Sequence, residues 1–200
     1  MKKILFILAL LISFSSFGQT ADEYYNRGIS KAEAKDYYGA ISDYNKAIQL
    51  NPNDAEAYYN RGISKDDLKD YNGAIADYTK AIELNPNYTF AYYNRGVSKG
   101  NLKDYYGAIS DNNKAIELDP NKASAYHNRG LSKNNLKDYY GAISDYNKAI
   151  QLNPNYTSAY RNRGISKENL GDLNGACSDW KKAAELGDTD AAGWVANQCN

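Results

Sequence analysis

The chain has 200 residues, of which 24 are basic and 24 acidic, so its formal net charge is zero. Nucleic-acid-binding proteins usually carry a basic patch or stripe, and the even spread of charge here argues against that class. Beyond the N-terminal segment the sequence contains no long apolar run. We therefore expect no membrane span in the mature chain.

The N-terminus has the layout of a secretory signal peptide. Two lysines precede an apolar stretch over residues 4–12, and the small residues Ser16 and Gly18 stand before a predicted cleavage point. The stretch is short for a transmembrane helix and lacks the right flanks, although a retained membrane anchor is the alternative interpretation. We expect removal of residues 1–18, a signal of bacterial type, and export to the periplasm or the outside of the cell.

The rest of the chain is dominated by a segment of 34 residues that recurs. Its second copy reads AEAYYNRGISKDDLKDYNGAIADYTKAIELNPNY. Self-similarity at a fixed period of this size indicates a stacked repeat array. The five copies span residues 21–54, 55–88, 89–122, 123–156 and 157–190.

Each copy predicts a helix, a tight turn, a second helix and a loop. Apolar residues in the second half of the repeat follow the spacing of an amphipathic helix. In the second copy, Asp70 is well placed to cap that helix and Pro86 stops it. After the fifth copy, residues 191–200 restart the first-helix pattern, which predicts a helix that caps the end of the array.

The second copy carries Tyr58, Gly62, Ala74, Tyr78, Ala81 and Pro86 at positions 4, 8, 20, 24, 27 and 32 of the repeat. With these residues the pattern resembles the tetratricopeptide repeat (TPR). That family carries an aromatic residue at position 4, a small one at 8, Ala at 20, an aromatic at 24, Ala at 27 and Pro at 32. The resemblance covers residues 21–190 and implies an all-α, right-handed helical solenoid whose first helices line a concave groove. In the third copy Asn112 replaces the aromatic residue at position 24, where we expect poorer packing.

Two positions of the first helix are candidates for ligand binding. Positions 5 and 6 lie on the helix face opposite the second helix, beside an aliphatic residue at position 9. An Asn side chain can both donate to and accept from a peptide unit. In some TPR proteins Asn at position 6 grips a bound peptide backbone, and we carry that role over as a hypothesis; recent duplication of the repeat is the alternative. The candidates are Asn26, Asn60, Asn94, Asn128 and Asn162 at position 6, and Tyr25, Tyr59, Tyr93, His127 and Arg161 at position 5.

Charged residues recur at two positions of the repeat. Every copy has Arg at position 7 and Asp at position 23, which predicts ion pairs between the two helices, with the Arg stems packed on Tyr rings.

Cys177 and Cys199 fall on consecutive predicted helices of an exported chain, which favours a disulfide. The alternative is two small apolar core residues. Two cysteines without an adjacent His offer too few ligands for a metal.

We predict no catalytic function. His127 is the only histidine, and without an orienting carboxylate or a nearby nucleophile it is interpreted as a surface substitution. No phosphate loop, nucleophile elbow, metal motif or cofactor motif is present. The sequence therefore predicts an interaction scaffold that binds an unidentified protein or peptide. The alternative is a structural envelope protein that acts through self-association of the solenoid ends, because the N-terminal repeat has no obvious cap.

Overall fold

The computed structural model describes residues 19–199, and the predicted signal peptide at 1–18 lies outside the described residues, as does residue 200. Over 19–199 the chain forms eleven helices and no strand, so the predicted all-α repeat fold is confirmed. The helices are α1 Ala21–Glu33, α2 Tyr37–Leu50, α3 Ala55–Asp67, α4 Tyr71–Leu84, α5 Thr89–Asn101, α6 Tyr105–Leu118, α7 Ala123–Asn135, α8 Tyr139–Leu152, α9 Thr157–Asn169, α10 Leu173–Glu185 and α11 Thr189–Gln198.

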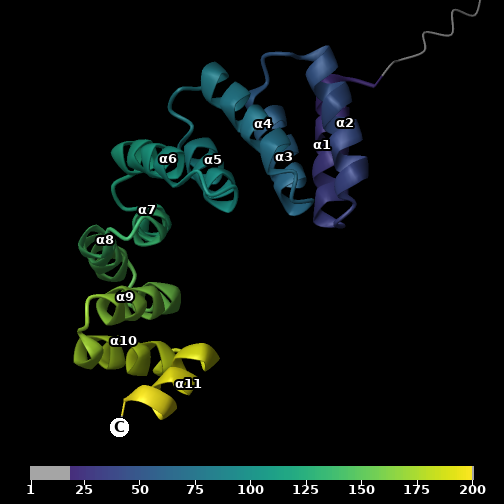
Figure 1. Ribbon diagram of the computed structural model, residues 1–200. Helices are drawn as coiled ribbons and strands as arrows, with labels where there is room; N and C mark the ends of the chain where they lie inside the picture. The colour runs from purple at the N-terminus through teal and green to yellow at the C-terminus, as the bar shows by residue number, and fades with distance from the viewer. Residues whose placement is uncertain (1–18, 200) are drawn as a thin grey trace, which may run out of the picture.

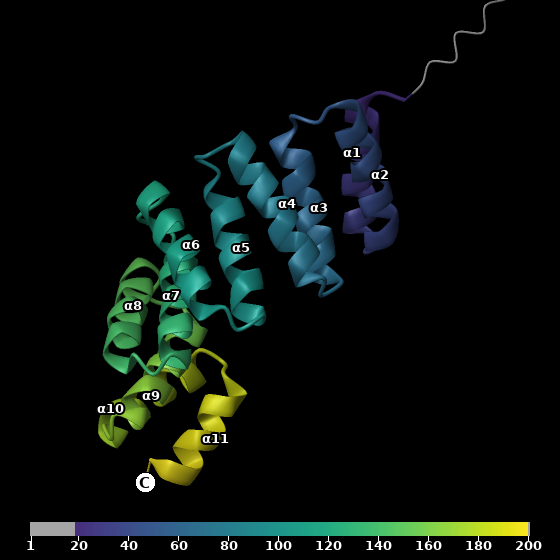
Figure 2. The same ribbon diagram turned by 45° about the horizontal axis from the view of Figure 1, so that its top comes forward.

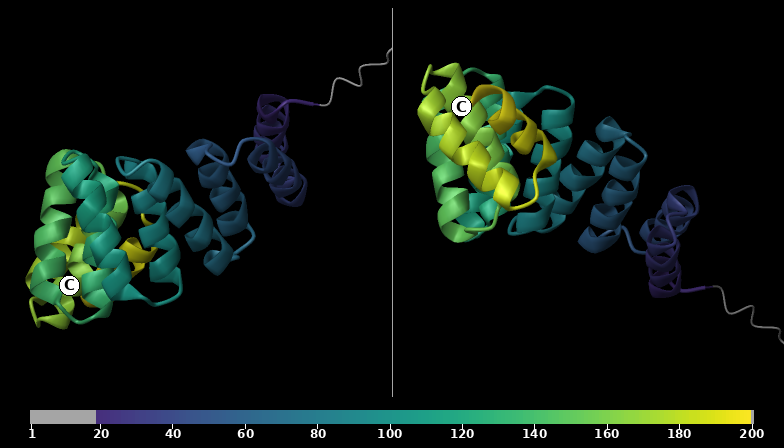
Figure 3. Two further views of the ribbon diagram at one scale, coloured as in Figure 1. Left: turned by 90° about the horizontal axis from the view of Figure 1, so that it is seen from above. Right: turned by 90° about the horizontal axis from the view of Figure 1, so that it is seen from below.

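The helix pairs stack along a curve (Figure 1). Helices α5 and α7, which are first helices of their repeats, lie on the inside of the curve, and α6 and α8 lie on the outside. Figure 2 shows α1 and α2 at one end of the stack and α11 at the other. Viewed from above and below, the first pair projects away while α11 lies against the C-terminal pairs (Figure 3). None of the helices in the described range is long and apolar enough to cross a bilayer.

The turn inside each pair uses the same local chemistry. The Asp70 carboxylate accepts a hydrogen bond from the backbone N–H of Gly73 at 3.0 Å, which caps α4 as predicted. The preceding residue, Lys69, has a φ of 62° and so lies in the left-handed region. The last helix, α11, begins two residues before its predicted start, because Asp188 caps it by accepting from the N–H of Ala191 at 2.9 Å.

The two helices of a repeat approach closely where Gly meets an aromatic ring. In the second repeat a Cβ atom on Gly62 would lie only 2.7 Å from Cε1 of Tyr78, and the Tyr78 side chain is fully buried. Burying a side chain of this size contributes about 1.5–3 kcal/mol. The same position-24 burial is made by Tyr44, Tyr146 and Trp180 in the first, fourth and fifth repeats.

The predicted Arg–Asp pairs are confirmed in all five repeats. In the second repeat Nε of Arg61 donates to Oδ2 of Asp77 at 2.8 Å, and the guanidinium lies 5.3 Å from the centroid of the Tyr58 ring. The carboxylate has a second partner that the sequence analysis missed, because Nζ of Lys65 lies 2.7 Å from Oδ2. Each buried Asp is therefore neutralised by two cations of its own repeat. In the first repeat, hydrogen bonds from the equivalent cations lower the pKa of Asp43 to about 2.

The C-terminal end of the stack is closed by a helix that is both packed and covalently attached. The rings of Trp180 and Trp194 lie 5.2 Å apart between their centroids. The sulfur atoms of Cys177 and Cys199 are bonded at 2.03 Å, which ties α11 to α10. The last repeat thus has a cover for its apolar face.

Candidate functional site

The structure brings the candidate residues at positions 5 and 6 together across the repeat boundaries. Nδ2 of Asn60 donates to the Tyr25 hydroxyl of the preceding repeat at 2.8 Å, and Nδ2 of Asn94 donates to the Tyr59 hydroxyl at 3.0 Å. One amide hydrogen of each of these two side chains therefore already joins neighbouring repeats, a contact that was not predicted from the sequence.

The partner tyrosines are held in neutral form. Besides accepting from Asn60, the Tyr25 hydroxyl donates to Oε2 of Glu56 at 3.2 Å. Burial and the nearby Glu56 carboxylate raise the pKa of Tyr25 to about 12. The Tyr59 ring packs on Tyr88, with 4.8 Å between centroids, and burial raises the pKa of Tyr59. These rings are fixed supports for the Asn side chains.

His127 is buried, with 8% of its surface exposed, so the predicted surface location is wrong. Its ring packs against Tyr156 at 4.9 Å between centroids, because the end of the fourth repeat folds over position 5. Asn162 Nδ2 lies 3.0 Å from Nε2, and Asn128 Oδ1 lies 3.2 Å from Nδ1. These partners assign the neutral tautomer with hydrogen on Nδ1, and burial lowers the pKa of His127.

The candidate residues of the first and fifth repeats have different surroundings from those between them. Nη1 of Arg161 donates to Oδ2 of Asp188 at 3.2 Å and lies 3.6 Å from Oδ2 of Asp190. Arg161 therefore anchors the start of the capping helix. At the other end, Asn26 is exposed, because no repeat precedes it in the described part of the chain.

The junction between the third and fourth repeats breaks the pattern. No hydrogen bond joins Tyr93 to Asn128 among residues 19–199, although the equivalent bonds form at the other three junctions. Lys122 takes the place that Tyr occupies in the second and fourth repeats. Its Nζ lies 4.1 Å from the centroid of the Phe90 ring and 4.9 Å from that of Tyr93. Burial lowers the pKa of Lys122.

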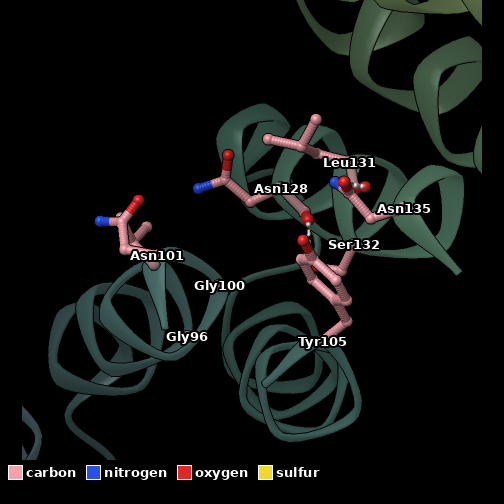
Figure 4. Close-up of a pocket in the computed structure, with 9 residues that line it drawn as sticks. Gly96, Gly100, Asn101, Tyr105, Asn128, Leu131, Ser132 and Asn135 are labelled. Atoms are coloured by element: carbon pink, nitrogen blue, oxygen red, sulfur yellow. Dashed lines mark hydrogen bonds between the residues drawn. The ribbon is translucent and has the colours of Figure 1, made fainter. Parts of the chain in front are cut away.

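A pocket of about 110 Å³ lies at this same junction, between α5 and α7. Gly96, Gly100 and Asn101 of α5 form one side of it, and Tyr105 of α6 lies at its base (Figure 4). Asn128 was among the predicted site residues and poorer packing was expected at Asn112, but the pocket itself was not predicted. From α7 the pocket is lined by Asn128, Leu131, Ser132 and Asn135.

Comparison with known families assigns the repeats. A family model described as "Tetratricopeptide repeat" matches residues 55–88, 89–122 and 123–156, and one described as "TPR repeat" matches residues 31–64. The chain belongs to the tetratricopeptide repeat family. Among curated proteins, none matches this TPR chain.

Solved structures share the TPR solenoid over nearly all of the described chain. MamA from Desulfovibrio magneticus RS-1 is 25% identical, with a TM-score of 0.80, 84% of this chain covered and 96% of that chain. Another MamA structure is 30% identical, with a TM-score of 0.76 and coverage of 82% and 96%. YrrB, described as a TPR protein with an unusual peptide-binding site, is 22% identical, with a TM-score of 0.76 and coverage of 88% and 92%.

The TPR family and the solenoid fold support a role as a protein-interaction scaffold. Within residues 19–199 no three His, Cys, Asp or Glu side chains are grouped so that they could hold a metal ion. The buried carboxylates at position 23 are engaged by Arg and Lys of their own repeats. Positions 5, 6 and 9 of the first helices supply amide, aromatic and aliphatic side chains.

Proposed function

We propose that this TPR protein is a non-catalytic scaffold that binds an extended polypeptide along the inside of its curve. The observation that carries the proposal is the hydrogen bonding of Asn60 and Asn94. Each side chain donates one amide hydrogen to a Tyr of the preceding repeat. The second amide hydrogen and the side-chain oxygen Oδ1 have no partner among residues 19–199. A donor and an acceptor held in place in this way match the N–H and C=O groups of one peptide unit.

Pre-organisation supports this proposal in energetic terms. A side chain that is fixed before binding loses less conformational entropy when the ligand arrives. The bond between Asn60 and Tyr25, and the packing of Tyr59 on Tyr88, supply this fixing. Because the amides would contact the ligand backbone, most of the groove would accept different ligand sequences.

We also propose that the protein works in an exported compartment, the periplasm or the outside of the cell. The signal-like residues 1–18 point to export. The bond between Cys177 and Cys199 supports the same compartment, because disulfides persist under oxidising conditions and are rare in the cytosol.

The test compares a double variant, Asn60→Ala with Asn94→Ala, with a control in which Asn72 is changed to Ala. Asn72 is an exposed residue of α4. Binding of several unrelated decapeptides to the mature protein is measured by fluorescence polarisation. The double variant should lose affinity for all of them by at least about tenfold, since each backbone hydrogen bond contributes about 1 kcal/mol. The control should bind like wild type.

Two outcomes would contradict the proposal. Unchanged affinity in the folded double variant would exclude the Asn side chains as the grip. Multimers that form with increasing concentration, without binding of any peptide, would favour self-association of the solenoid. Circular dichroism must accompany the binding assay, because each Asn→Ala change also removes a bond to Tyr and should lower stability by about 1 kcal/mol.

A further inference from the structure

We infer that the pocket between α5 and α7 receives an aromatic side chain, tyrosine above all, from the bound polypeptide; this rests on the proposed polypeptide-binding function. The pocket would add a preference at one ligand position to a groove that otherwise contacts the backbone. Leu131, Asn101 and Asn135 line the pocket and are exposed, so its mouth opens on the inner face of the curve.

The second repeat shows what normally fills this space. The Tyr78 ring lies against Gly62, where an added Cβ would be 2.7 Å from Cε1. The Tyr78 hydroxyl donates to Oδ2 of Asp66 at 2.8 Å. The hydroxyl of Ser98, in the next repeat, donates to Oδ1 of the same carboxylate at 2.8 Å. Positions 8 and 12 of one repeat and position 10 of the next therefore surround the ring.

In the third repeat two of these residues have changed. Asn112 replaces the Tyr, and its short side chain turns back so that Nδ2 donates to the backbone oxygen of Ala108 at 2.9 Å. Gly100 replaces the Asp, and a Cβ built on it would meet only Cβ of Ala108, at 4.0 Å. The pocket is lined by Gly96, Gly100 and Ser132, which are the equivalents of the residues around Tyr78. It is the space of a missing tyrosine ring.

The walls suit an aromatic ring. Val97 and Leu131 supply apolar surface, and the ring of Tyr105 at the base offers an aromatic partner. The volume of about 110 Å³ is of the same order as the ~150 Å³ engineered cavity that admits benzene. Ser132 donates to the backbone oxygen of Asn128 at 3.0 Å, which leaves its own oxygen able to accept from a phenol hydroxyl. This favours tyrosine over phenylalanine.

The backbone of the same ligand residue also has a partner at this junction. Nδ2 of Asn128 has no hydrogen-bond acceptor among residues 19–199, in contrast to Nδ2 of Asn60 and Asn94. Asn128 lines the pocket, so both of its amide hydrogens can serve a ligand whose ring enters beside it. This junction thus combines a side-chain amide that can donate to the ligand backbone with a pocket that can hold a ligand side chain.

The experiment fills the pocket from within by Asn112→Tyr, which restores the residue of the first, second and fourth repeats. The matched control is Asn72→Tyr, the same substitution at a position where other repeats carry Tyr38, Tyr106 and Tyr140, all at least 76% exposed. The probes are p-cresol, an analogue of the tyrosine side chain, and the pentapeptides Ser-Ser-X-Ser-Ser with X as Tyr, Phe or Ala. Binding is followed by amide NMR shifts and by calorimetry.

In wild type and in the control, p-cresol should shift the amide signals of Gly96, Gly100 and Leu131. The Tyr peptide should bind more tightly than the Ala peptide by on the order of tenfold, the discrimination that a small apolar contact provides. In Asn112→Tyr both effects should disappear. Retention of p-cresol binding in Asn112→Tyr, or equal affinity for the three peptides in every protein, would overturn the inference.

The design separates this inference from the proposed function. If all three peptides bind equally, and the variant with Asn60→Ala and Asn94→Ala loses them all, the backbone grip stands and the aromatic pocket fails. If no peptide binds while p-cresol still does, the proposed function fails and the inference with it.

Discussion

The substitution Asn112→Tyr should stabilise the protein, although it changes a residue that is already buried. Asn112 is 1% exposed, and its Oδ1 has no hydrogen-bond partner among residues 19–199. A Tyr at this position would place its ring over Gly96, as Tyr78 does over Gly62 in the second repeat. The change therefore removes an unsatisfied carbonyl and fills a pocket at once.

The size of the effect follows from three contributions. Burial of the ring stabilises by about 1.5–3 kcal/mol, and loss of the unsatisfied carbonyl by about 1–3 kcal/mol. The new hydroxyl lacks a carboxylate at Gly100 and is held by its own helix, so unlike the phenol of a ligand that enters from the mouth it is not free to turn toward Ser132. The Tyr146 hydroxyl, held in the same way, has no partner in the described range, and we count a cost of about 1–3 kcal/mol for such a hydroxyl. The two polar contributions cancel, so the net gain is about 2 kcal/mol. For a chain of this size the melting temperature should rise by about 4–8 °C.

Differential scanning calorimetry on three variants tests this reasoning. Asn112→Tyr should melt above wild type, and Asn72→Tyr, an exposed change, should stay within about 0.5 kcal/mol of it. Tyr78→Asn recreates the pocket in the second repeat and should lose about 3–5 kcal/mol. A melting temperature for Asn112→Tyr at or below that of wild type would refute the view that the third repeat lacks only a ring.

The remaining predictions concern charge, the disulfide and the buried histidine. Asp77→Asn should destabilise the protein by about 3 kcal/mol, because Arg61 and Lys65 lose their shared carboxylate, and a melting temperature unchanged from wild type would contradict this. The pKa of Asp43 is lowered to about 2, so its stabilising contribution should be complete above about pH 4 and lost as the pH falls toward 2; acid melts of Asp43→Asn, which should lack this transition, check it. Cys199→Ser should cost about 3 kcal/mol for a loop of 22 residues. Reductant should lower the melting temperature of wild type but not of the variant; equal sensitivity would exclude a role for the disulfide. Because burial lowers the pKa of His127 below the ~6.5 of an unfolded chain, stability should fall from pH 7.5 to 5.5 in wild type and less steeply in His127→Tyr; identical slopes would assign the titration to another group.

The helix pairs, the turn caps and the Arg–Asp pairs could be predicted because each depends on spacing inside one repeat, and that spacing recurs five times. Asp70 and Arg61 are examples, since their partners lie in the same repeat. Lys65 could have been found by the same reasoning, because it stands four residues after Arg61 on one helix face.

Contacts between repeats could not be predicted from the sequence alone. The bond from Asn60 to Tyr25 depends on how closely successive first helices approach, and that distance follows from the curvature of the whole stack. His127 is buried because the end of its own repeat folds back over it. The pocket needed both Asn112 and Gly100, and their conjunction gains meaning only once the path of the Tyr78 ring is known.

The internal ion pairs also determine how the chain can fold. Each Arg–Asp contact joins residues only 16 apart, whereas the Tyr–Asn contacts between repeats join residues 35 apart. Chains rich in local contacts fold rapidly, and in a linear array folding can start at any unit and spread to its neighbours. Within residues 19–199 the third repeat has no ring at position 24 and no hydrogen bond from Tyr93 to Asn128, so its coupling to the fourth repeat depends on the packing of α6 against α7.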